Sequence, residues 1–399
     1  MRQLIHFHAL GRGAAVVGAA RSLLLIALAA LVLCVTPALG QSGSRSWTGN
    51  TSTDFYDGTN WSAAGNFPNG NVTFRDSALS GAANTTIDRG SGTYNYVYGL
   101  YFNNTLGTEN SYTINGPTKF FIGGSVIQTS TVTSGSLTDV INCNIQKAGS
   151  AETFNIGLNH DLTVNGVIFG GSTLTTKTGA GTLTLAGANT YSSGTLVNAG
   201  TLDLVGDDIL SGALTVDGTG TAKLSASGHN AMDGLTALTI QNGGTYSDNS
   251  TADLVHTVSA AITFNNGGTM TSEGAADGNS GFGGFLYNNG INVTGTGLAT
   301  INANRIGFAF AETVTVEDTV AGSGTDLLIS SSIRPNWEGL ITKAGAGTME
   351  LTGTNTDTAP WSISAGTLKI GGAGQLGSGS YAGAITMSYL MSRITRRRQ

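Results

Sequence analysis

One segment of the sequence occurs twice, and this duplication limits the fold more than any other feature of the chain. Residues 177–190 read KTGAGTLTLAGANT and residues 343–356 read KAGAGTMELTGTNT, an offset of 166 residues without a gap (Lys177 to Lys343). The match resumes at AGTLDL, residues 199–204, and AGTLKI, residues 365–370. A unit of under about thirty residues cannot bury a core alone, so it must stack on similar neighbours.

Within each unit, apolar residues alternate with polar ones, which is the period-two pattern of a strand with one buried face. Glycine and asparagine follow each run, and these residues tolerate the positive φ angles of tight turns. We therefore predict that the repeat core consists of Leu183, Leu185, Leu196, Leu202, Leu204, Met349, Leu351, Leu368 and Ile370. The predicted repeat turns contain Gly187, Asn189, Gly200, Gly353, Asn355 and Gly366.

Looser versions of the unit fill the sequence between the two copies. Leu238-Thr-Ile240 precedes an Asn-Gly-Gly-Thr turn, and Ala261-Ile-Thr-Phe264 precedes another. The composition agrees, because 60 glycines, 5 prolines and only 11% charged residues are typical of many short strands and tight turns. The predicted fold is an all-β, right-handed parallel β-helix over residues 151–386, with clear repeats at 177–204 and 343–370.

Aromatic residues concentrate ahead of the first clear repeat, in residues 41–150. Trp47 and Trp61 lie near the start, and Tyr94, Tyr96 and Tyr98 follow in strand-like alternation. Because a solenoid needs a cap over the open end of its core, this region is predicted to hold an aromatic-rich N-terminal cap and the first β coils. The alternative is that Trp47 and Trp61 form a glycan-stacking surface.

The first forty residues have the pattern of a secretory signal peptide. Three arginines precede an apolar run over residues 23–35, and small residues stand at Ala38 and Gly40. A bilayer span needs about 20 apolar residues, so cleavage near Gly40 is favoured over an N-terminal membrane anchor. The mature protein is therefore expected outside the cytoplasm.

The net charge argues against a nucleic-acid partner, and the cysteine content argues against an intramolecular disulfide. Loss of residues 1–40 changes the formal charge from −6 to −9, because three of the 18 basic residues leave and all 24 acidic residues remain. Nucleic-acid binding requires clustered Lys and Arg, so no nucleic-acid partner is expected. Only Cys143 follows the predicted signal peptide, so stability must come from burial and hydrogen-bonded strands rather than from an intramolecular disulfide.

The histidines do not have the spacing that metal binding requires. His160, His229 and His256 lie far apart in the sequence, without Cys or His partners at ligand spacing. We expect them to be surface residues without partners. No metal site and no cofactor are predicted.

A β-helical polysaccharide lyase or hydrolase would need carboxylates clustered on one face. Adjacent residues on a strand point to opposite faces, so neighbouring acids do not act together without a bulge or a turn. The candidate pairs are Asp207 with Asp208, Glu317 with Asp318, and Asp54 with Asp57. No catalytic residue is predicted from them.

The end of the sequence departs from the Gly and Thr pattern. Residues 387–399 hold four arginines and two methionines in thirteen positions. We interpret this atypical Arg-rich segment either as a sorting tail or as out-of-frame translation after a truncation.

The two units resemble the autotransporter-associated β-strand repeat, also called the passenger-associated transport repeat. The pattern of this family is a Lys and then Gly-x-Gly-Thr-Leu-x-Leu-x-Gly-x-Asn-Thr-Tyr, followed by Gly-Thr-x-Val and Ala-Gly-Thr-Leu. The first copy follows the pattern nearly throughout, whereas the second departs from it at Asp357, Pro360 and Trp361. The resemblance implies a parallel β-helix exposed at a bacterial surface, with repeats that aid passenger folding and export, and it implies no catalytic residue.

The expected function is therefore that of an exported, non-enzymatic passenger or stalk protein, secreted or associated with the outer membrane after cleavage of its signal peptide. The expected partners are the secretion machinery and a surface polysaccharide or the outer membrane. A glycan-binding adhesin is the alternative, and a polysaccharide lyase or hydrolase is a further one. Neither a translocator pattern nor a Pro-Glu-Pro sorting signal is evident in the sequence, so the anchoring route stays open.

Overall fold

A computed structural model describes residues 43–388 apart from 63–67, 69, 75–85, 91–95, 106–109, 118, 150, 207–209, 226–233, 250–254, 273–283, 323 and 335–338. The predicted signal peptide, residues 1–40, and most of the predicted Arg-rich tail, residues 389–399, lie outside the described residues. Among the described residues, no helix has the length and apolar character that crossing a membrane demands.

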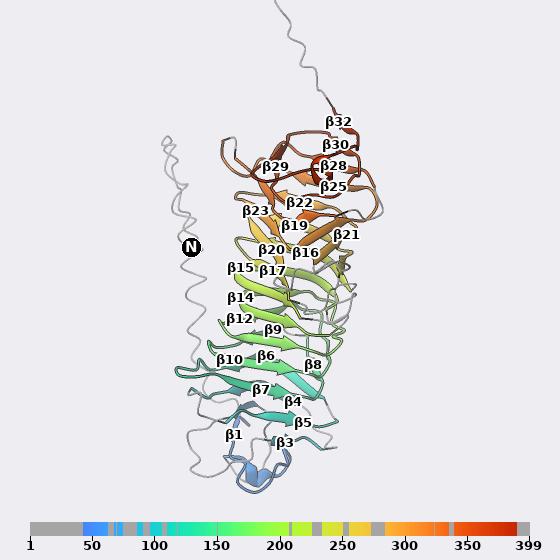
Figure 1. Ribbon diagram of the computed structural model, residues 1–399. Helices are drawn as coiled ribbons and strands as arrows, with labels where there is room; N and C mark the ends of the chain where they lie inside the picture. Colours follow the sequence, from blue (N-terminus) through green and yellow to red (C-terminus); the bar gives the residue numbers. More distant parts are fainter. Residues whose placement is uncertain are drawn as a thin grey trace, which may run out of the picture. The chain divides into compact units, whose positions relative to one another are not determined.

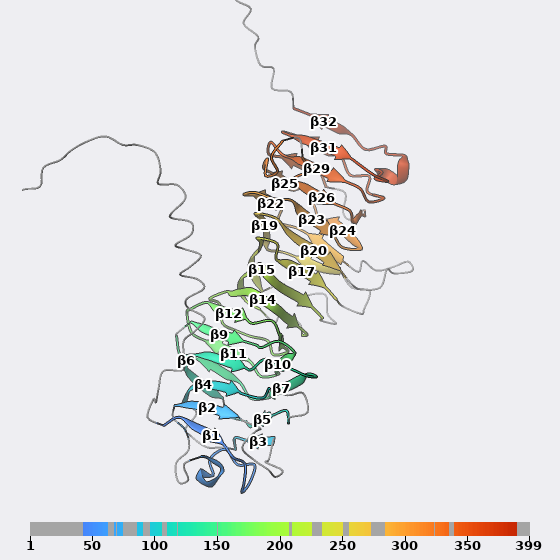
Figure 2. The ribbon, with the colours of Figure 1, turned by 90° about the vertical axis from the view of Figure 1, so that its left-hand side faces the viewer.

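The described residues from Gly43 onward lie in one compact unit and form a parallel β-solenoid of about 12 turns, which confirms the predicted fold class (Figures 1 and 2). Each full coil contributes one short strand to each of three columns, and the strands of a column pair in parallel from coil to coil. We call these columns 1, 2 and 3, in the order in which the chain passes through them. Neighbouring strands in such a column lie about 4.8 Å apart.

Most strands belong to a single column. Column 1 contains β1 (Arg45–Trp47), β2 (Asn71–Phe74), β9 (Glu152–Asn155), β12 (Thr175–Thr178), β16 (Leu235–Gln241), β19 (Ala261–Asn265), β22 (Ile291–Thr294), β25 (Glu312–Val316), β28 (Ile341–Ala344), β30 (Trp361–Ile363) and β32 (Ile385–Met387). Column 2 contains β3 (Thr86–Asp88), β5 (Thr113–Asn115), β7 (Leu137–Ile141), β10 (His160–Val164), β13 (Thr182–Leu185), β17 (Thr245–Asp248), β20 (Gly268–Ser272), β23 (Ala299–Asn302), β26 (Leu327–Ile329), β29 (Thr348–Leu351) and β31 (Thr367–Ile370).

Column 3 is present in two separate stretches of the solenoid. Its strands are β8 (Ile145–Lys147) and β11 (Ile168–Gly170), and later β18 (Val255–Val258), β21 (Gly284–Tyr287), β24 (Arg305–Phe308) and β27 (Ser332–Ile333). Four long strands bend from one column into the next, namely β4 (Tyr96–Phe102), β6 (Phe120–Thr129), β14 (Thr195–Leu204) and β15 (Gly212–Leu224). Two short 3-10 helices complete the described elements, η1 (Gly58–Asn60) and η2 (Gly377–Gly379).

Period-two alternation produces two kinds of side-chain ladder along column 2. Inside, Leu162, Leu183 and Leu202 are register partners in consecutive coils and are buried. Outside, six threonines lie in register on successive coils: Thr182, Thr201, Thr221, Thr245, Thr269 and Thr300. Apolar burial stabilises the stack from within, while β-branched threonine favours the extended backbone on the outside.

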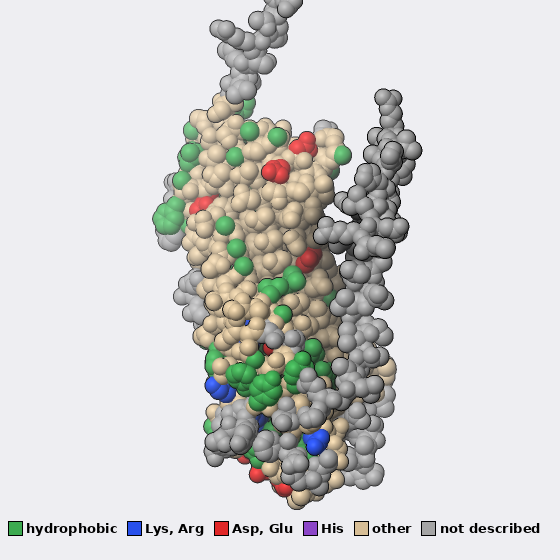
Figure 3. All heavy atoms as spheres, turned by 180° about the vertical axis from the view of Figure 1, so that it is seen from behind, with side chains coloured by type: hydrophobic (Ala, Val, Ile, Leu, Met, Phe, Trp, Pro, Cys, Tyr) green, Lys and Arg blue, Asp and Glu red, His purple; other side chains and the backbone are tan. Residues whose placement is uncertain are grey.

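The outer surface carries little charge. The face seen in Figure 3 consists mainly of uncharged polar side chains and backbone, with scattered acidic and basic groups and a few hydrophobic clusters. This agrees with a chain in which 11% of the residues are charged.

Aromatic side chains close the N-terminal end of the solenoid, as the sequence predicts. The Trp47 and Trp61 rings meet edge to face with centroids 5.0 Å apart, and Phe55 lies 5.0 Å from Trp61 in the same geometry. The Arg89 guanidinium lies 3.6 Å from the Phe120 ring centroid beneath this cluster. Such edge-to-face and cation–π contacts add to the area that the rings bury.

The structure contradicts the alternative role of the two tryptophans. Trp47 is 1% exposed and Trp61 is 2% exposed, and the Trp61 indole N–H donates to the Phe55 carbonyl at 2.9 Å. Sugar stacking needs an open ring face, whereas these rings cover the end of the apolar core. Trp47 and Trp61 are therefore cap residues and not glycan-stacking residues.

Candidate functional site

Each of the two repeats contains a buried lysine at the same point of the coil. Lys177 lies in β12 between its register partners Phe154 and Val197, so its Cα belongs to the inward ladder of column 1. Lys343 occupies the same position in β28, between Val314 and Ile363. The two lysines are 1% and 0% exposed.

The lysine ammonium groups bind backbone carbonyls at the corner between columns 1 and 2. Lys177 Nζ donates to the carbonyls of Thr178 at 2.9 Å, Gly179 at 2.8 Å and, one coil later, Ala199 at 3.0 Å. Three acceptors match the three protons of an ammonium group. The second repeat reproduces these bonds from Lys343 Nζ to Ala344 at 2.9 Å, Gly345 at 2.9 Å and Ala365 at 3.1 Å.

Burial lowers the pKa of both lysines. Desolvation lowers the pKa of Lys177 to about 8, and the negative charge of Asp161 opposes this change. Desolvation likewise lowers the pKa of Lys343 to about 8, with Asp326 opposing it. Asp161 and Asp326 are equivalent, because each lies at the start of the column 2 strand in the coil before its repeat.

Glycine at the repeat corner allows the next coil to approach the lysine and its carbonyls. A Cβ added to Gly200 would lie 2.4 Å from the Gly179 carbonyl oxygen and 2.5 Å from that of Gly181. Gly366 has the same surroundings, with carbonyl oxygens of the preceding turn at 2.4 Å. Both glycines also have positive φ, +64° and +68°, which disfavours any residue with a Cβ.

The other predicted turn positions act through close approach and side-chain bonding rather than through positive φ. A Cβ on Gly187 would lie 2.5 Å from the Gly166 carbonyl oxygen, and one on Gly353 would lie 2.2 Å from that of Ser331. Asn189 Oδ1 accepts the backbone N–H of Ile168 at 2.7 Å. Asn355 Oδ1 accepts that of Ile333 at 2.8 Å in the same way.

The two asparagines lie where column 3 ends. Ile168 begins β11, the last strand of the first stretch of column 3, and Ile333 ends β27, the last strand of the second stretch. The coil that follows has no column 3 strand, and it spans 20 residues in both repeats, from Thr175 to Thr195 and from Ile341 to Trp361. The repeat is therefore the coil at which the solenoid changes from three strands per turn to two.

The structure buries most of the predicted repeat core. Exposure is 2% or less for Leu183, Leu185, Leu202, Leu204, Met349 and Leu351. These side chains occupy β13, β14 and β29, where coils lie on both sides of them.

Three predicted core positions differ from the prediction. Leu196 is only half-buried, because Lys177 and Val197 are register partners in the inward ladder and Leu196 pairs with Thr176 on the outer face. Leu368 is also half-buried and Ile370 is 44% exposed. Both lie in β31, and among the described residues no later strand pairs with β31 to cover them.

The second repeat compensates for its departures from the pattern. In the first repeat, Tyr191 and Thr195 fill the interior and their hydroxyl oxygens lie 2.8 Å apart. In the second, Trp361 takes the position of Thr195 and is 1% exposed, so a large aromatic side chain is again buried in the coil. Asp357 replaces Tyr191 and holds the local turn by accepting the Ala359 N–H at 3.1 Å.

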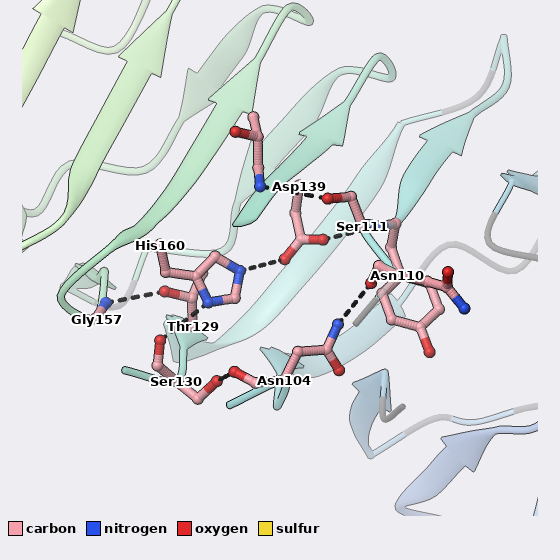
Figure 4. A network of polar contacts seen from close by, with 10 residues as sticks. Asn104, Asn110, Ser111, Thr129, Ser130, Asp139, Gly157 and His160 are labelled. Carbon is pink, nitrogen blue, oxygen red and sulfur yellow. Dashed lines mark hydrogen bonds and ion pairs between the residues drawn. The ribbon is translucent and has the colours of Figure 1, made fainter. Parts of the chain in front are cut away.

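The prediction that the histidines are surface residues is wrong for the two that the structure describes; His229 lies outside the described residues. His160 is fully buried, with Nε2 2.7 Å from Asp139 Oδ2 and Nδ1 2.9 Å from the Ser130 carbonyl (Figure 4). Asp139 Oδ1 also accepts the Tyr112 N–H at 2.7 Å, so the pair links three successive coils. His256 is buried as well, 3.2 Å from Asp248.

A further buried polar pair has no counterpart in the sequence predictions. Glu152 is 0% exposed, and desolvation raises its pKa to about 8, with Lys147 opposing the change. Lys147 Nζ donates to the Thr173 carbonyl and to Thr175 Oγ1, each at 2.7 Å, and lies 4.8 Å from the Tyr191 ring centroid. These side chains fill the solenoid interior just before the first repeat.

The structure describes two of the three acidic pairs, and it places one in a turn and the other on the surface. Asp54 and Asp57 hold the turn around η1, where Asp57 accepts the Thr59 N–H at 3.0 Å and Asp54 accepts the Tyr56 N–H at 2.9 Å. Both side chains of the Glu317–Asp318 pair are exposed, and Asp207 and Asp208 lie outside the described residues. Within the described part of the chain, no group of three His, Cys, Asp or Glu side chains could hold a metal ion.

Comparison with known protein families finds a match at both repeats. A family model described as the passenger-associated transport repeat matches residues 176–204 and 341–370. The matched segments coincide with the two lysine turns, and this confirms the resemblance identified from the sequence. Searches of curated proteins and of solved structures found no match.

Proposed function

We propose that this chain is an exported, non-enzymatic stalk of a bacterial cell surface, in which the repeats promote folding of the passenger during secretion. The two passenger-associated transport repeats within a parallel β-solenoid support this proposal, because this architecture fits an autotransporter passenger-like protein. The secretion machinery is then its first partner, and the first forty residues are the signal peptide that leads it there.

The equivalence of the two repeats is the observation that supports this proposal most strongly. They are far apart in sequence, yet each has the same lysine and asparagine hydrogen bonds, the same closely packed corner glycine and the same 20-residue coil. The lysine and asparagine side chains bind backbone atoms of neighbouring coils, and the glycines allow those coils to approach one another. These contacts join each repeat coil to its neighbours, which is the role expected of a repeat that promotes folding.

A stalk role also fits the buried polar pairs. His160 and Asp139 have the residue types of a catalytic dyad, but both are 0% exposed and bind backbone groups of adjacent coils. A general base must reach a substrate proton at hydrogen-bond distance. The pair supports the proposal because its bonds hold coils together.

Surface display tests the proposal. The full chain is produced in a Gram-negative bacterium, the N-terminus of the exported protein is sequenced, and residues 43–388 are also displayed as the passenger of an unrelated autotransporter. We expect cleavage near Gly40 and efficient exposure to protease added outside the cell. Replacing both corner glycines, Gly200→Ala with Gly366→Ala, should reduce display severalfold.

The matched control is the pair Gly218→Ala with Gly322→Ala. These glycines also have positive φ, +59° and +90°, but a Cβ at Gly218 would meet only one atom, at 3.8 Å, and one at Gly322 would meet none within 4 Å. Equal display of the two double variants would show that the repeat corners have no special role in export. Retention of the whole chain in the cytoplasm would contradict the exported assignment.

A further inference from the structure

The imidazole ring of His160 has a hydrogen-bond partner at each of its two nitrogens, although the ring is fully buried. Nδ1 lies 2.9 Å from the backbone carbonyl oxygen of Ser130, and Nε2 lies 2.7 Å from Asp139 Oδ2 (Figure 4). Asp139 is also 0% exposed, and its Oδ1 accepts the Tyr112 N–H at 2.7 Å. The Tyr112 ring packs against Phe74, with centroids 5.3 Å apart.

These partners determine where the protons of the pair lie. A carbonyl oxygen only accepts hydrogen bonds, so Nδ1 carries a proton and donates it to Ser130. A neutral imidazole has one ring proton, and its Nε2 would then be an acceptor. The ionised carboxylate of Asp139 is an acceptor as well, so two lone pairs would face each other at 2.7 Å. The contact therefore requires one more proton, between Nε2 and Oδ2.

The strands packed around the pair contain few other ionisable side chains. β5, β6 and β13 contain none, and β7 contains only Asp139. β10 adds Asp161, which lies on the outer face as the register partner of Thr182. In the neighbouring column 1, the charge of Lys177 interacts with Asp161, and Glu152 interacts with Lys147. The proton between the two side chains is therefore a property of the coupled pair.

We propose that His160 and Asp139 share a buried proton between Nε2 and Oδ2, and that the solenoid takes up this proton when it folds. Tyr112 precedes β5, Asp139 lies in β7 and His160 begins β10, so the protonated pair joins three successive coils. In an unfolded chain, histidine loses its second ring proton with a pKa of about 6.5. Above this pH the folded pair binds one proton more than the unfolded chain, so its contribution to stability decreases as the pH rises. This inference does not depend on the proposed function.

Asp139→Asn tests the proposal, because the amide has the shape of the carboxylate and supplies its own proton. Its oxygen accepts the Tyr112 N–H and its nitrogen donates to Nε2 of a neutral His160, so the variant needs no shared proton. Urea denaturation gives the unfolding constants of the full chain and of the variant from pH 7 to pH 9. The ratio of the parent constant to the variant constant should increase by up to about tenfold per pH unit. Ionisable groups elsewhere contribute to both constants and cancel in this ratio. A ratio that does not change with pH would overturn the proposal.

Asp217→Asn is the matched control for the loss of a carboxylate. Asp217 accepts hydrogen bonds from the side-chain amides of Gln241 at 3.0 Å and Asn242 at 2.8 Å. Both partners are donors, so this carboxylate needs no proton. The ratio of the parent constant to the Asp217→Asn constant should therefore stay constant from pH 7 to pH 9.

Nuclear magnetic resonance provides a second readout that needs only the parent chain. In the full chain labelled with 15N-histidine, the ring of His160 should show two slowly exchanging hydrogen-bonded protons at pH 8. Asp139→Asn should show one ring proton at this position. A single ring proton on His160 in the parent at pH 8 would overturn the proposal, even if Asp139→Asn does not fold.

Discussion

Lys177 Nζ lies 3.0 Å from the carbonyl oxygen of Ala199, which belongs to the next coil of the solenoid. The corresponding distance from Lys343 to Ala365 is 3.1 Å. A charged side chain in an inward ladder is unusual, because an unpaired buried charge is strongly unfavourable. Here three carbonyls bind the ammonium group, so the lysine joins two coils at the corner between columns 1 and 2.

Replacement of Lys177 by Met should destabilise the protein, because Met fills a similar volume but removes the ammonium donor from the carbonyls of Thr178, Gly179 and Ala199. Of these carbonyls, that of Thr178 keeps a backbone donor, the Ile156 N–H. Hydrogen bonds to charged groups contribute about 1.5–3 kcal/mol, and we expect a loss in this range from the free energy of unfolding. Lys343→Met should have a similar effect. Urea denaturation followed by circular dichroism measures both.

Lys223→Met is the control for this lysine prediction. The Lys223 side chain is 35% exposed and lies 3.8 Å from Asp203 on the outer surface. Exposed ion pairs contribute about 0–1 kcal/mol, so the change should be small. A loss in Lys223→Met equal to that in Lys177→Met would show that the buried carbonyl cage contributes nothing particular.

The corner glycine leads to a second prediction. Gly200→Ala should destabilise the protein by more than Gly218→Ala, although both glycines have nearly the same φ, +64° and +59°. The left-handed backbone costs about 1–2 kcal/mol in each variant. Only the Gly200 Cβ would meet carbonyl oxygens at 2.4–2.5 Å, and overpacking adds about 1–3 kcal/mol. Equal denaturation midpoints for the two variants would contradict the close approach of the coils.

The repeat asparagine leads to a third prediction. Asn189→Ala removes the acceptor of the buried Ile168 N–H and should cost about 1–3 kcal/mol. Asn165→Ala is the matched control, because Asn165 donates to Asn142 Oδ1 at 2.7 Å in an exposed asparagine ladder. Hydrogen exchange gives the sharper readout: the Ile168 amide should exchange faster in Asn189→Ala and at the parent rate in Asn165→Ala.

Much of this fold could be predicted from the sequence because the repeat displays its own periodicity. Alternation of Leu183 and Leu185 with threonine indicates which face is inside, and the second copy shows that the unit stacks. The end of the stack was not predictable in this way. Ile370 has the same pattern as Leu351, and its 44% exposure arises from the absence of a covering strand among the described residues rather than from local sequence.

The burial of several polar residues follows the period-two pattern of their strands rather than their polarity. His160 alternates with Leu162 and Val164, and Glu152 alternates with Phe154, so the period-two pattern places both inside. Lys177 follows Thr175 by two positions in the same manner. The pattern was therefore present in the sequence, but the partners that make burial tolerable come from other coils and become visible only in the structure.

The buried carboxyl group of Glu152 makes stability depend on pH in a defined direction. Its pKa rises from 4.5 to about 8 on folding, chiefly through desolvation, so the folded state retains a proton that the unfolded state has released between these values. Stability from this group is therefore complete below about pH 4.5, decreases as the pH rises, and is lost by about pH 8. Glu152→Gln removes the titration while keeping the size and the neutral polar character of the side chain.

The free energy of unfolding of Glu152→Gln, minus that of the parent, should therefore increase between pH 4.5 and pH 8, by at most about 1.4 kcal/mol per pH unit. Urea denaturation at half-unit pH steps measures this difference. Glu152→Leu should give the same pH profile with a different constant offset, because it removes the same proton but packs differently. Lys147 should stay in place in both variants, since its ammonium bonds to Thr173 and Thr175 do not involve Glu152. If the difference in the free energy of unfolding does not change between pH 4.5 and pH 8, the Glu152 carboxyl group is ionised in the folded protein. It would then have a charged or hydrated partner there.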